Sequence, residues 1–256
     1  MTCMTIRQAF LAPFAALSLM ACAPAQGPQT SAGATAPAPA GVSAGPVISA
    51  PRAIDGRYAV FEVNGVNIPL PEGEWRRLGE ADLTTARNYP ASAVVLASET
   101  GGAIDRVVVV WRQRVLGGRR FGAFKNCGAS SNLTSDTRSS APASTDCVFV
   151  RAANWPSSGR LGPMLRKHAN ARGIFAPVVT VGPRVALSLS ARERIAVDYA
   201  FNPDLLAPHP DGEVWLPGDW TPSASRGGAR GAVVEALRDF GLNIRPQVAA
   251  AAKGSS

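Results

Sequence analysis

The stretch from residue 185 to residue 202 constrains the fold more than any other part of the chain. Apolar side chains alternate with small or polar ones in "VALSLS" and again in "IAVDYAFN". A side-chain period of two is typical of a β-strand, because successive residues point to opposite faces of a sheet. The charged segment "ARER" connects the two runs. We therefore expect an antiparallel hairpin with strands at 185–190 and 195–202, one covered face and one more polar face.

Two further hairpins are indicated nearer the amino terminus. In "RYAVFEVNGVNIPL" two apolar runs flank Asn64-Gly65, which is the usual signal for a type I′ turn. In the next pair the segment "ETGG" supplies glycines that tolerate positive φ. The continuous β-branched run Val107–Val110 predicts a strand that is buried on both faces near its middle. The expected strands cover 57–63, 66–70, 92–98 and 104–114.

Two amphipathic segments predict helices. The first covers 162–173, with Pro163 in its first turn and Gly173 just past its end. The second covers 230–241, where an apolar stripe ends at Gly241. Hairpins with two interspersed helices predict an α+β fold, in which an antiparallel β-sheet built from hairpins has two helices packed on it. The stripe of the second helix consists of Val233, Val234, Leu237 and Phe240.

The amino-terminal segment has the pattern of an export signal. Arg7 precedes the apolar run "AFLAPFAALSLMA" at 9–21, which is too short to span a bilayer core of about 30 Å. The run ends in "LMAC", and this segment, Leu19 to Cys22, resembles the lipobox of bacterial lipoproteins. The resemblance implies that the Cys22 thiol receives diacylglycerol, that a peptidase cuts before Cys22, and that the new amino terminus is acylated. Secretion without a lipid, or a buried amino-terminal helix, are the alternative interpretations.

The lipoprotein resemblance covers residues 1–22 only and carries an expectation about location. Several acyl chains on one residue hold a protein stably at a membrane, whereas one chain binds reversibly. We expect a bacterial cell-envelope protein whose lipid anchor is its contact with the membrane, either facing the periplasm or on the outer membrane. In that family an Asp after the lipidated Cys favours retention in the inner membrane. This chain has Ala23 at that position, so the resemblance implies the outer membrane.

The composition changes along the chain and indicates its domain organisation. Residues 23–50 contain no charged and no aromatic residue and are rich in Ala, Pro, Gly and Ser. Such a segment buries too little apolar surface to offset its ordering entropy, so we expect a disordered tether. The predicted organisation is a signal peptide at 1–21, the lipidated Cys and tether at 22–51, one α+β domain at 52–245, and a flexible tail at 246–256.

The cysteines predict one disulfide bond. Cys3 lies in the signal peptide and Cys22 in the lipobox, which leaves Cys127 and Cys147 in an oxidising compartment. A bond between them would close a polar surface loop and add about 3 kcal/mol of stability in the loop-entropy model. A metal or redox pair is the rival hypothesis, but no Cys-x-x-Cys spacing supports it.

The net charge of +8 raises the question of an anionic partner. All basic residues except Lys125, Lys167 and Lys253 are Arg, and they are spread along the chain. Nucleic-acid binding needs a clustered basic surface, so we expect no nucleic-acid partner. Binding of an anionic envelope glycolipid or phospholipid stays open as a hypothesis.

One segment stands out as a candidate site, "APHPDGEVWLPGDW" at 207–220. Three of its polar side chains alternate and can face one metal ion, but a solvated loop is the interpretation we favour, with no metal or cofactor. Two tryptophans beside a carboxylate can form a sugar-stacking platform, although large aromatics more often cap a core. The candidate ligand contacts are His209, Asp211, Trp215, Asp219 and Trp220, and Glu213 completes the alternation.

No recognised catalytic motif occurs, and we assign no catalytic residue. His168 is expected to be a partly buried helix residue, and Trp75, Trp111 and Trp155 are expected to pack against the core. The leading hypothesis is a non-enzymatic binding or structural domain, with an envelope protein or an anionic glycan or lipid as partner. The alternative is an envelope hydrolase with a carboxylate-based site, since glycosidases need only two suitably spaced carboxyl groups.

Overall fold

The computed structural model describes residues 47–48, 53–54, 58–63, 66–84, 90–118, 120–141, 143–155, 159–207 and 209–253. All of them belong to one compact unit. The predicted signal peptide, Cys22, most of the tether and the Asn64-Gly65 turn lie outside the described residues. The side chains of 47, 48, 53, 54, 58, 59 and 84 are likewise outside this description.

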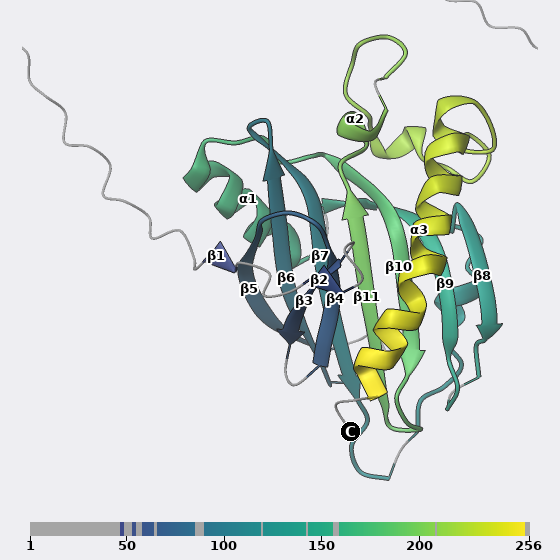
Figure 1. The fold of residues 1–256 in the computed structure, drawn as a ribbon. Coiled ribbons are helices and arrows are strands. Elements are labelled where there is room, and N and C mark those ends of the chain that lie inside the picture. Colours follow the sequence, from purple (N-terminus) through teal and green to yellow (C-terminus); the bar gives the residue numbers. More distant parts are fainter. Residues whose placement is uncertain are drawn as a thin grey trace, which may run out of the picture. The chain divides into compact units, whose positions relative to one another are not determined.

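An antiparallel sheet of eight strands dominates the described part of the chain (Figure 1). Its strands follow one another across the sheet in the order β1-β5-β6-β7-β11-β10-β9-β8. Neighbours in sequence are therefore mostly neighbours in space, as in hairpin-built sheets. The strands are β1 (Val47–Ile48), β5 (Trp75–Thr84), β6 (Pro90–Thr100), β7 (Ala103–Arg114), β8 (Thr134–Ser139), β9 (Asp146–Asn154), β10 (Val179–Ser188) and β11 (Glu193–Phe201).

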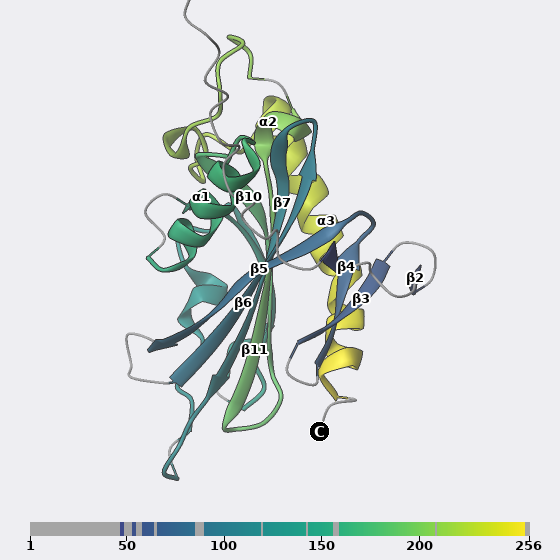
Figure 2. The ribbon, with the colours of Figure 1, turned by 90° about the vertical axis from the view of Figure 1, so that its left-hand side faces the viewer.

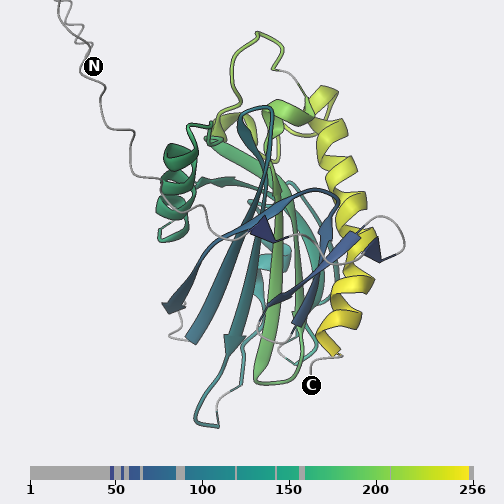
Figure 3. The same ribbon diagram turned by 60° about the vertical axis from the view of Figure 1, so that its left-hand side comes forward.

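The two faces of this sheet are covered by different elements. A small antiparallel sheet and the long helix α3 (Gly228–Lys253) lie on one side, and helix α1 (Leu161–Arg172) lies on the other (Figure 2). Figure 3 shows the short helix α2 (Pro203–Leu206) beside the upper end of α3. The small sheet contains β2 (Ala53–Ile54), β3 (Tyr58–Val63) and β4 (Val66–Pro71), and two 3₁₀ turns are η1 (Lys125–Gly128) and η3 (Pro217–Asp219).

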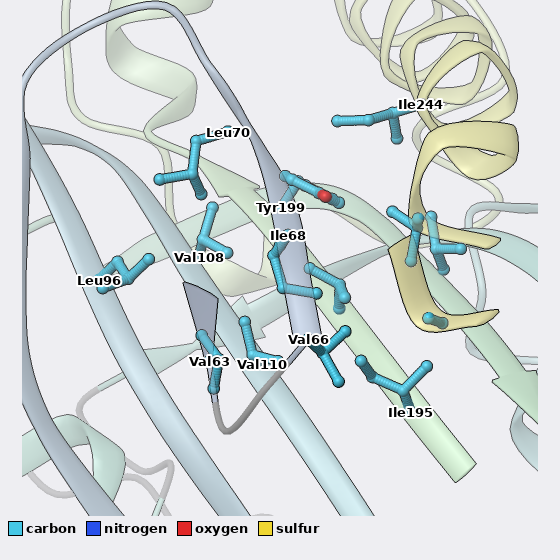
Figure 4. Close-up of a cluster of buried hydrophobic side chains, with 14 of the residues drawn as sticks. Val63, Val66, Ile68, Leu70, Leu96, Val108, Val110, Ile195, Tyr199 and Ile244 are labelled. Atoms are coloured by element: carbon cyan, nitrogen blue, oxygen red, sulfur yellow. The ribbon is translucent and has the colours of Figure 1, made fainter. Parts of the chain in front are cut away.

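The main core fills the space between the large sheet, the β3–β4 hairpin and α3 (Figure 4). The alternating residues of β11, Ile195, Val197 and Tyr199, are buried here. The Tyr199 hydroxyl donates to the Pro69 carbonyl oxygen at 2.9 Å. The small sheet thus supplies the hydrogen-bond acceptor for this buried polar group. The expected apolar face of the β10–β11 hairpin is confirmed.

The opposite face of the sheet differs from the expectation of a more polar surface. Ala196, Asp198 and Ala200 of β11 are also buried, because other elements cover this side. Leu161, Leu165 and Ala169 of α1 pack there on Val95, Val107 and Val109. Alanine at alternate positions made the strand look half exposed, although small side chains also suit close packing against a helix.

The six expected strands are present, and most extend beyond their predicted ends. The "ETGG" turn is confirmed, since Gly101 and Gly102 both have positive φ and Thr100 pairs with Ala103. The residues Val107–Val110 are buried on both faces, as predicted. Strands β5 and β8 were missed, because "WRRLGEADLT" and "TSDTRS" show little apolar alternation.

The expected helix at 162–173 is confirmed as α1. Gly173 takes the left-handed conformation after the last helical residue, and its amide donates to the carbonyl oxygens of Ala169 and Asn170. His168 is partly buried, as expected, and its Nε2 lies 2.7 Å from Glu99 Oε1. This contact and the Arg172–Glu99 ion pair at 3.2 Å attach the helix to the end of β6.

The second helix is longer than predicted, and two expectations about it are wrong. Helix α3 continues through Gly241 and Pro246 to Lys253, so Gly241 does not end it and the described part of the tail is helical. Ile244, Val248 and Ala252 repeat at helical spacing and are buried in the main core. Their burial offsets the missing amide hydrogen bond at Pro246, which costs about 3 kcal/mol in a helix interior.

The absence of a side chain at Gly241 lets α3 approach the sheet. A Cβ atom at this position would lie 2.7 Å from Pro183 Cβ and 2.7 Å from Val148 Cγ1. Such a distance is shorter than packed carbon atoms adopt. Gly241 therefore serves close helix-to-sheet packing in place of helix termination.

The predicted disulfide is present between Cys127 and Cys147, with 5.9 Å between the Cα atoms. Both residues are buried. The bond attaches η1 to β9. The segment that it closes was expected to be a surface loop, but it contains the strand β8, which pairs with β9.

None of the helices in the described ranges combines the length and apolarity that a membrane span requires.

Replacement of Gly241 by Ala tests the close approach of α3. The added methyl group should overpack the contact, at a cost of about 1–3 kcal/mol. This exceeds the gain of about 1 kcal/mol in helix propensity. Urea unfolding should therefore show a net loss of stability. The control is Gly227→Ala, since a Cβ there meets no atom within 4 Å; equal midpoints for both variants would contradict the packing argument.

Candidate ligand-binding cleft

A cleft opens on the α1 side of the large sheet, between α1 and η1. Its volume is about 590 Å³, which lies within the range of small-molecule sites. Strands β7, β11, β10 and β9 form its floor, and Ala153 and Ala196 occupy two floor positions. Because alanine fills little space, a hollow remains above the sheet between the two flanking elements. We call this hollow the α1 cleft; its lining includes Trp111, Phe124, Arg151, Trp155, Arg184 and Asp198.

The buried carboxylate of Asp198 forms part of the cleft floor. Arg184 donates from Nε to Oδ1 at 2.5 Å and from Nη2 to Oδ2, a bidentate pair. Trp111 Nε1 donates to Oδ2 at 2.7 Å. Arg151 Nη2 lies farther away, 3.4 Å from Oδ1 and 3.3 Å from Oδ2. Three side chains from three strands thus bind a single carboxylate on a fourth.

The environment keeps Asp198 ionised. Burial by itself raises the pKa of this carboxyl group, but the positive charges of Arg151 and Arg184 and the hydrogen bonds from Arg184 and Trp111 outweigh it. Together they lower the pKa of Asp198 from 3.8 to about 2. A carboxyl group with this pKa has no proton to donate near neutral pH and is a weak base, so it suits a structural role better than acid–base catalysis.

The two arginines of the cleft floor are engaged to different extents. Arg184 is buried, bidentate with Asp198, and lies over the Trp111 ring with its guanidinium carbon 5.5 Å from the ring centroid. The side chain of Arg151 is 36% exposed. Among the described residues, its hydrogen bonds all come from Nη2 and all go to Asp198. The other N–H donors of the Arg151 guanidinium group therefore remain available to a ligand in the cleft.

The charge balance at Arg151 is visible in its pKa. Attraction to Asp198 raises the pKa of Arg151, but burial and the neighbouring charge of Arg184 lower it, and the net change is downward. Arginine nevertheless stays protonated in proteins. Two guanidinium charges therefore share one carboxylate, which leaves one unit of positive charge on the cleft floor.

Aromatic side chains form the walls of the cleft. The Arg194 guanidinium carbon lies 4.6 Å from the Phe124 ring centroid and 4.4 Å from that of Phe121, so this cation packs against both rings. The Phe124 ring also lies 6.5 Å from Phe149, which follows the disulfide-bonded Cys147 by two residues. On the other side, Trp155 Nε1 donates to Thr180 Oγ1. These contacts hold the walls in place before any ligand arrives.

The segment singled out from the sequence, 207–220, lies elsewhere. It borders a second hollow of about 510 Å³ that His209, Asp211, Trp215 and Asp219 line. The rings of Trp215 and Trp220 are buried against β9, β10 and the start of α3, with centroids 5.2 Å apart. Both rings pack into the core here, as large aromatics usually do, and a ligand contact at this segment stays a prediction.

The polar residues of this segment hold its backbone. Asp219 Oδ2 accepts from the Leu216 amide at 2.8 Å, and His209 Nδ1 accepts from the Asp211 amide at 3.2 Å. His209 Nδ1 and Asp211 Oδ2 are 3.9 Å apart. Across the ranges that the structure describes, no three His, Cys, Asp or Glu side chains gather in a way that could hold a metal ion.

A smaller hollow of about 330 Å³ near the end of α3 bears on the hydrolase alternative, because Asp146 and Glu193 both line it. Burial raises the pKa of Asp146 above its ordinary value, and with the nearby charge of Asp136 it outweighs the opposing charge of Arg138. Burial also acts to raise the pKa of Glu193, but Arg112 and Arg114 outweigh it, and the net change is downward. Each carboxylate already has an arginine partner: Arg245 Nε lies 3.4 Å from Asp146 Oδ1, and Arg114 Nε lies 3.1 Å from Glu193 Oε1.

Sequence reasoning missed the α1 cleft, although one signal for it was present. Asp198 is the single charged residue in the apolar run "IAVDYAF", and a charge inside a buried strand requires a partner. In the observed register Asp198 lies opposite Arg184 on β10. Trp111, which was expected only to pack, lines the cleft and donates to the same carboxylate.

Comparison of the chain with protein-family models, with curated proteins and with solved structures found no match. The interpretation of the cleft therefore depends on its own geometry and charges.

The lowered pKa of Asp198 predicts a specific acid sensitivity. A group whose folded pKa lies below its unfolded value stabilises the fold above the unfolded pKa and loses this effect as pH falls. For Asp198 the loss should occur between about pH 4 and pH 2, and should amount to about 2 kcal/mol. Urea midpoints measured across this range should fall more steeply for the wild type than for Asp198→Asn. If the urea midpoints of the two proteins changed with pH in the same way, the lowered pKa of Asp198 would be contradicted.

Proposed function

We propose that this protein is a bacterial cell-envelope lipoprotein, anchored through Cys22, whose folded domain binds a small ligand in the α1 cleft without transforming it. The preformed hollow on the sheet is the observation that carries the binding part of the proposal. Its size suits a small molecule, its walls are aromatic, and its floor carries fixed charges. The anchor part depends on the export-signal pattern and on the lipobox resemblance.

The state of the cleft's buried carboxylate supports binding over catalysis. Asp198 is the one carboxyl group among the described residues that line the cleft. Hydrolysis by a carboxylate pair needs a second carboxyl group and an acid with a raised pKa, whereas the pKa of Asp198 is low and its oxygens are engaged. Fixed charges and rigid walls are what a preorganised binding site requires.

The hydrolase alternative has one observation in its favour, the raised pKa of Asp146 in the smaller hollow. Turnover of an envelope substrate that Asp146→Asn abolishes would establish it and would displace the binding proposal.

Lipid anchoring can be tested with two cysteine variants of the full chain expressed in a bacterium. The wild type should partition into a detergent-rich phase, because several acyl chains give stable membrane attachment. Cys22→Ser should lose this partitioning. Cys3→Ser is the matched control, since Cys3 lies within the predicted signal peptide and should leave the anchor intact. Partitioning that is unaffected by Cys22→Ser would exclude a lipid at this position.

Occupancy of the cleft can be tested by filling it. Ala153→Leu adds three carbon atoms at the floor and should displace the fluorescent probe anilinonaphthalene sulfonate, which combines an apolar body with one anionic group. The measurement is probe fluorescence on the full chain carrying Cys22→Ser, which avoids detergent. We expect a loss of affinity of at least about tenfold, as a steric block costs more than about 1.4 kcal/mol.

Two controls decide whether the probe reports on the cleft. Ala229→Leu adds the same atoms at an exposed position in the first turn of α3, where they enter the second hollow and not the cleft, and should leave binding unchanged. Leu216→Ser removes an exposed apolar side chain that lines the second hollow and not the cleft. Loss of the probe signal in Leu216→Ser, and not in Ala153→Leu, would contradict the proposal.

A further inference from the structure

The cleft holds more positive charge than its own carboxylate balances. Arg151, Arg160 and Arg184 line it, with Asp198 as the counter-charge. The guanidinium group of Arg160 donates to a neutral acceptor, the Asp82 carbonyl oxygen, at 2.9 Å. The lining therefore carries more positive than negative charge, and a neutral ligand would leave the excess positive charge without a counter-charge.

The hydrogen bonds to Asp198 indicate that the unbalanced positive charge is that of Arg151. Arg184 and Trp111 already supply Asp198 with three short bonds. The two contacts from Arg151 are the longest of the set, at 3.3 and 3.4 Å, and come from one nitrogen. Arginine has five N–H donors in a planar fork. Among the described residues, no acceptor binds the remaining donors of Arg151, and this side chain lines the cleft.

We propose that Arg151 is the specificity-determining residue of the α1 cleft and binds the anionic group of a small organic ligand whose apolar body lies between the aromatic walls. This inference rests on the proposed binding function and names the chemical class of its ligand, a monoanion such as a carboxylate with an attached ring or short acyl chain. On the strands of the floor, Arg151 and Arg184 face Asp198, and the one net charge there matches one anionic group; Arg160 lies outside the floor, just before α1. Trp111, Phe124 and Trp155 match the apolar body.

The partial burial of the site strengthens this recognition. A charge-assisted hydrogen bond is about twice as strong as a neutral one, and salt screens a partly buried pair less than an exposed pair. A neutral amide of the same shape would leave the guanidinium of Arg151 without a counter-charge. The cleft should therefore distinguish a carboxylate from its amide, although the two have nearly the same size.

The test uses isothermal titration of the full chain carrying Cys22→Ser with octanoate and benzoate, with their amides, and with inorganic phosphate. We expect each carboxylate to bind at least about tenfold more tightly than its amide, the ratio expected for loss of one charged hydrogen bond. The octanoate and benzoate arms distinguish an acyl ligand from an aryl ligand. Phosphate, which lacks an apolar body, should bind more weakly than the better carboxylate.

Three arginine variants separate a specific contact from general charge. Arg151→Gln should reduce carboxylate affinity to that of the amide and leave amide affinity unchanged. Arg151→Lys keeps the charge but loses the planar fork, and should bind at an intermediate level. Arg226→Gln removes the same charge at an exposed position and should bind like the parent chain. Thermal unfolding of each variant shows that the domain is folded.

The outcomes also separate this inference from the proposed function. Equal affinity for carboxylate and amide, or carboxylate affinity that survives Arg151→Gln in a folded chain, overturns the anion inference. If Ala153→Leu still displaces the probe in that case, the cleft remains a binding site for another ligand class. If no carboxylate binds at millimolar concentration, the inference fails, and if the probe is also not displaced, the proposed function fails with it.

Discussion

One carboxylate links four consecutive strands of the large sheet. Asp198 on β11 accepts hydrogen bonds from Trp111 on β7, from Arg184 on β10 and from Arg151 on β9, and these strands lie side by side in the order β7-β11-β10-β9. Removal of any donor would leave a buried charge less well compensated, and a buried unpaired charge is strongly destabilising. The network therefore ties the register of the central strands to the charge pattern of the cleft.

Small residues set where the other elements can approach this network. Gly241 lets α3 pack directly on Pro183 and Val148 on one face of the sheet. On the opposite face Ala153 and Ala196 keep the floor low between α1 and the disulfide-bonded turn η1. The α1 face of the sheet thus carries the larger hollow, and side-chain size at a few positions sets how closely other elements pack on each face.

The sequence predicted those parts of the fold whose signals are local. Period-two alternation indicated β10 and β11, paired glycines indicated the turn between β6 and β7, and Gly173 indicated the end of α1. Strand β8 was missed because its six residues are mostly polar, and its pairing with β9 depends on tertiary contacts. The end of α3 was misplaced because Gly241 and Pro246 usually terminate helices, while the burial of Val248 and Ala252 outweighs both.

The cleft could not be predicted, because its members are 87 residues apart in the case of Trp111 and Asp198 and 47 in the case of Arg151 and Asp198. Their convergence needs the strand order, which alternation alone does not supply. The network also contains one more positive charge than is needed to neutralise Asp198. Arg184 and Trp111 already neutralise and bind Asp198, whereas Arg151 brings a second charge that is only partly buried. Despite the attraction to Asp198, burial and the charge of Arg184 lower the pKa of Arg151. Since desolvation of a charge is costly, a second, partly buried guanidinium beside a carboxylate that is already neutralised is consistent with the anionic ligand proposed for Arg151.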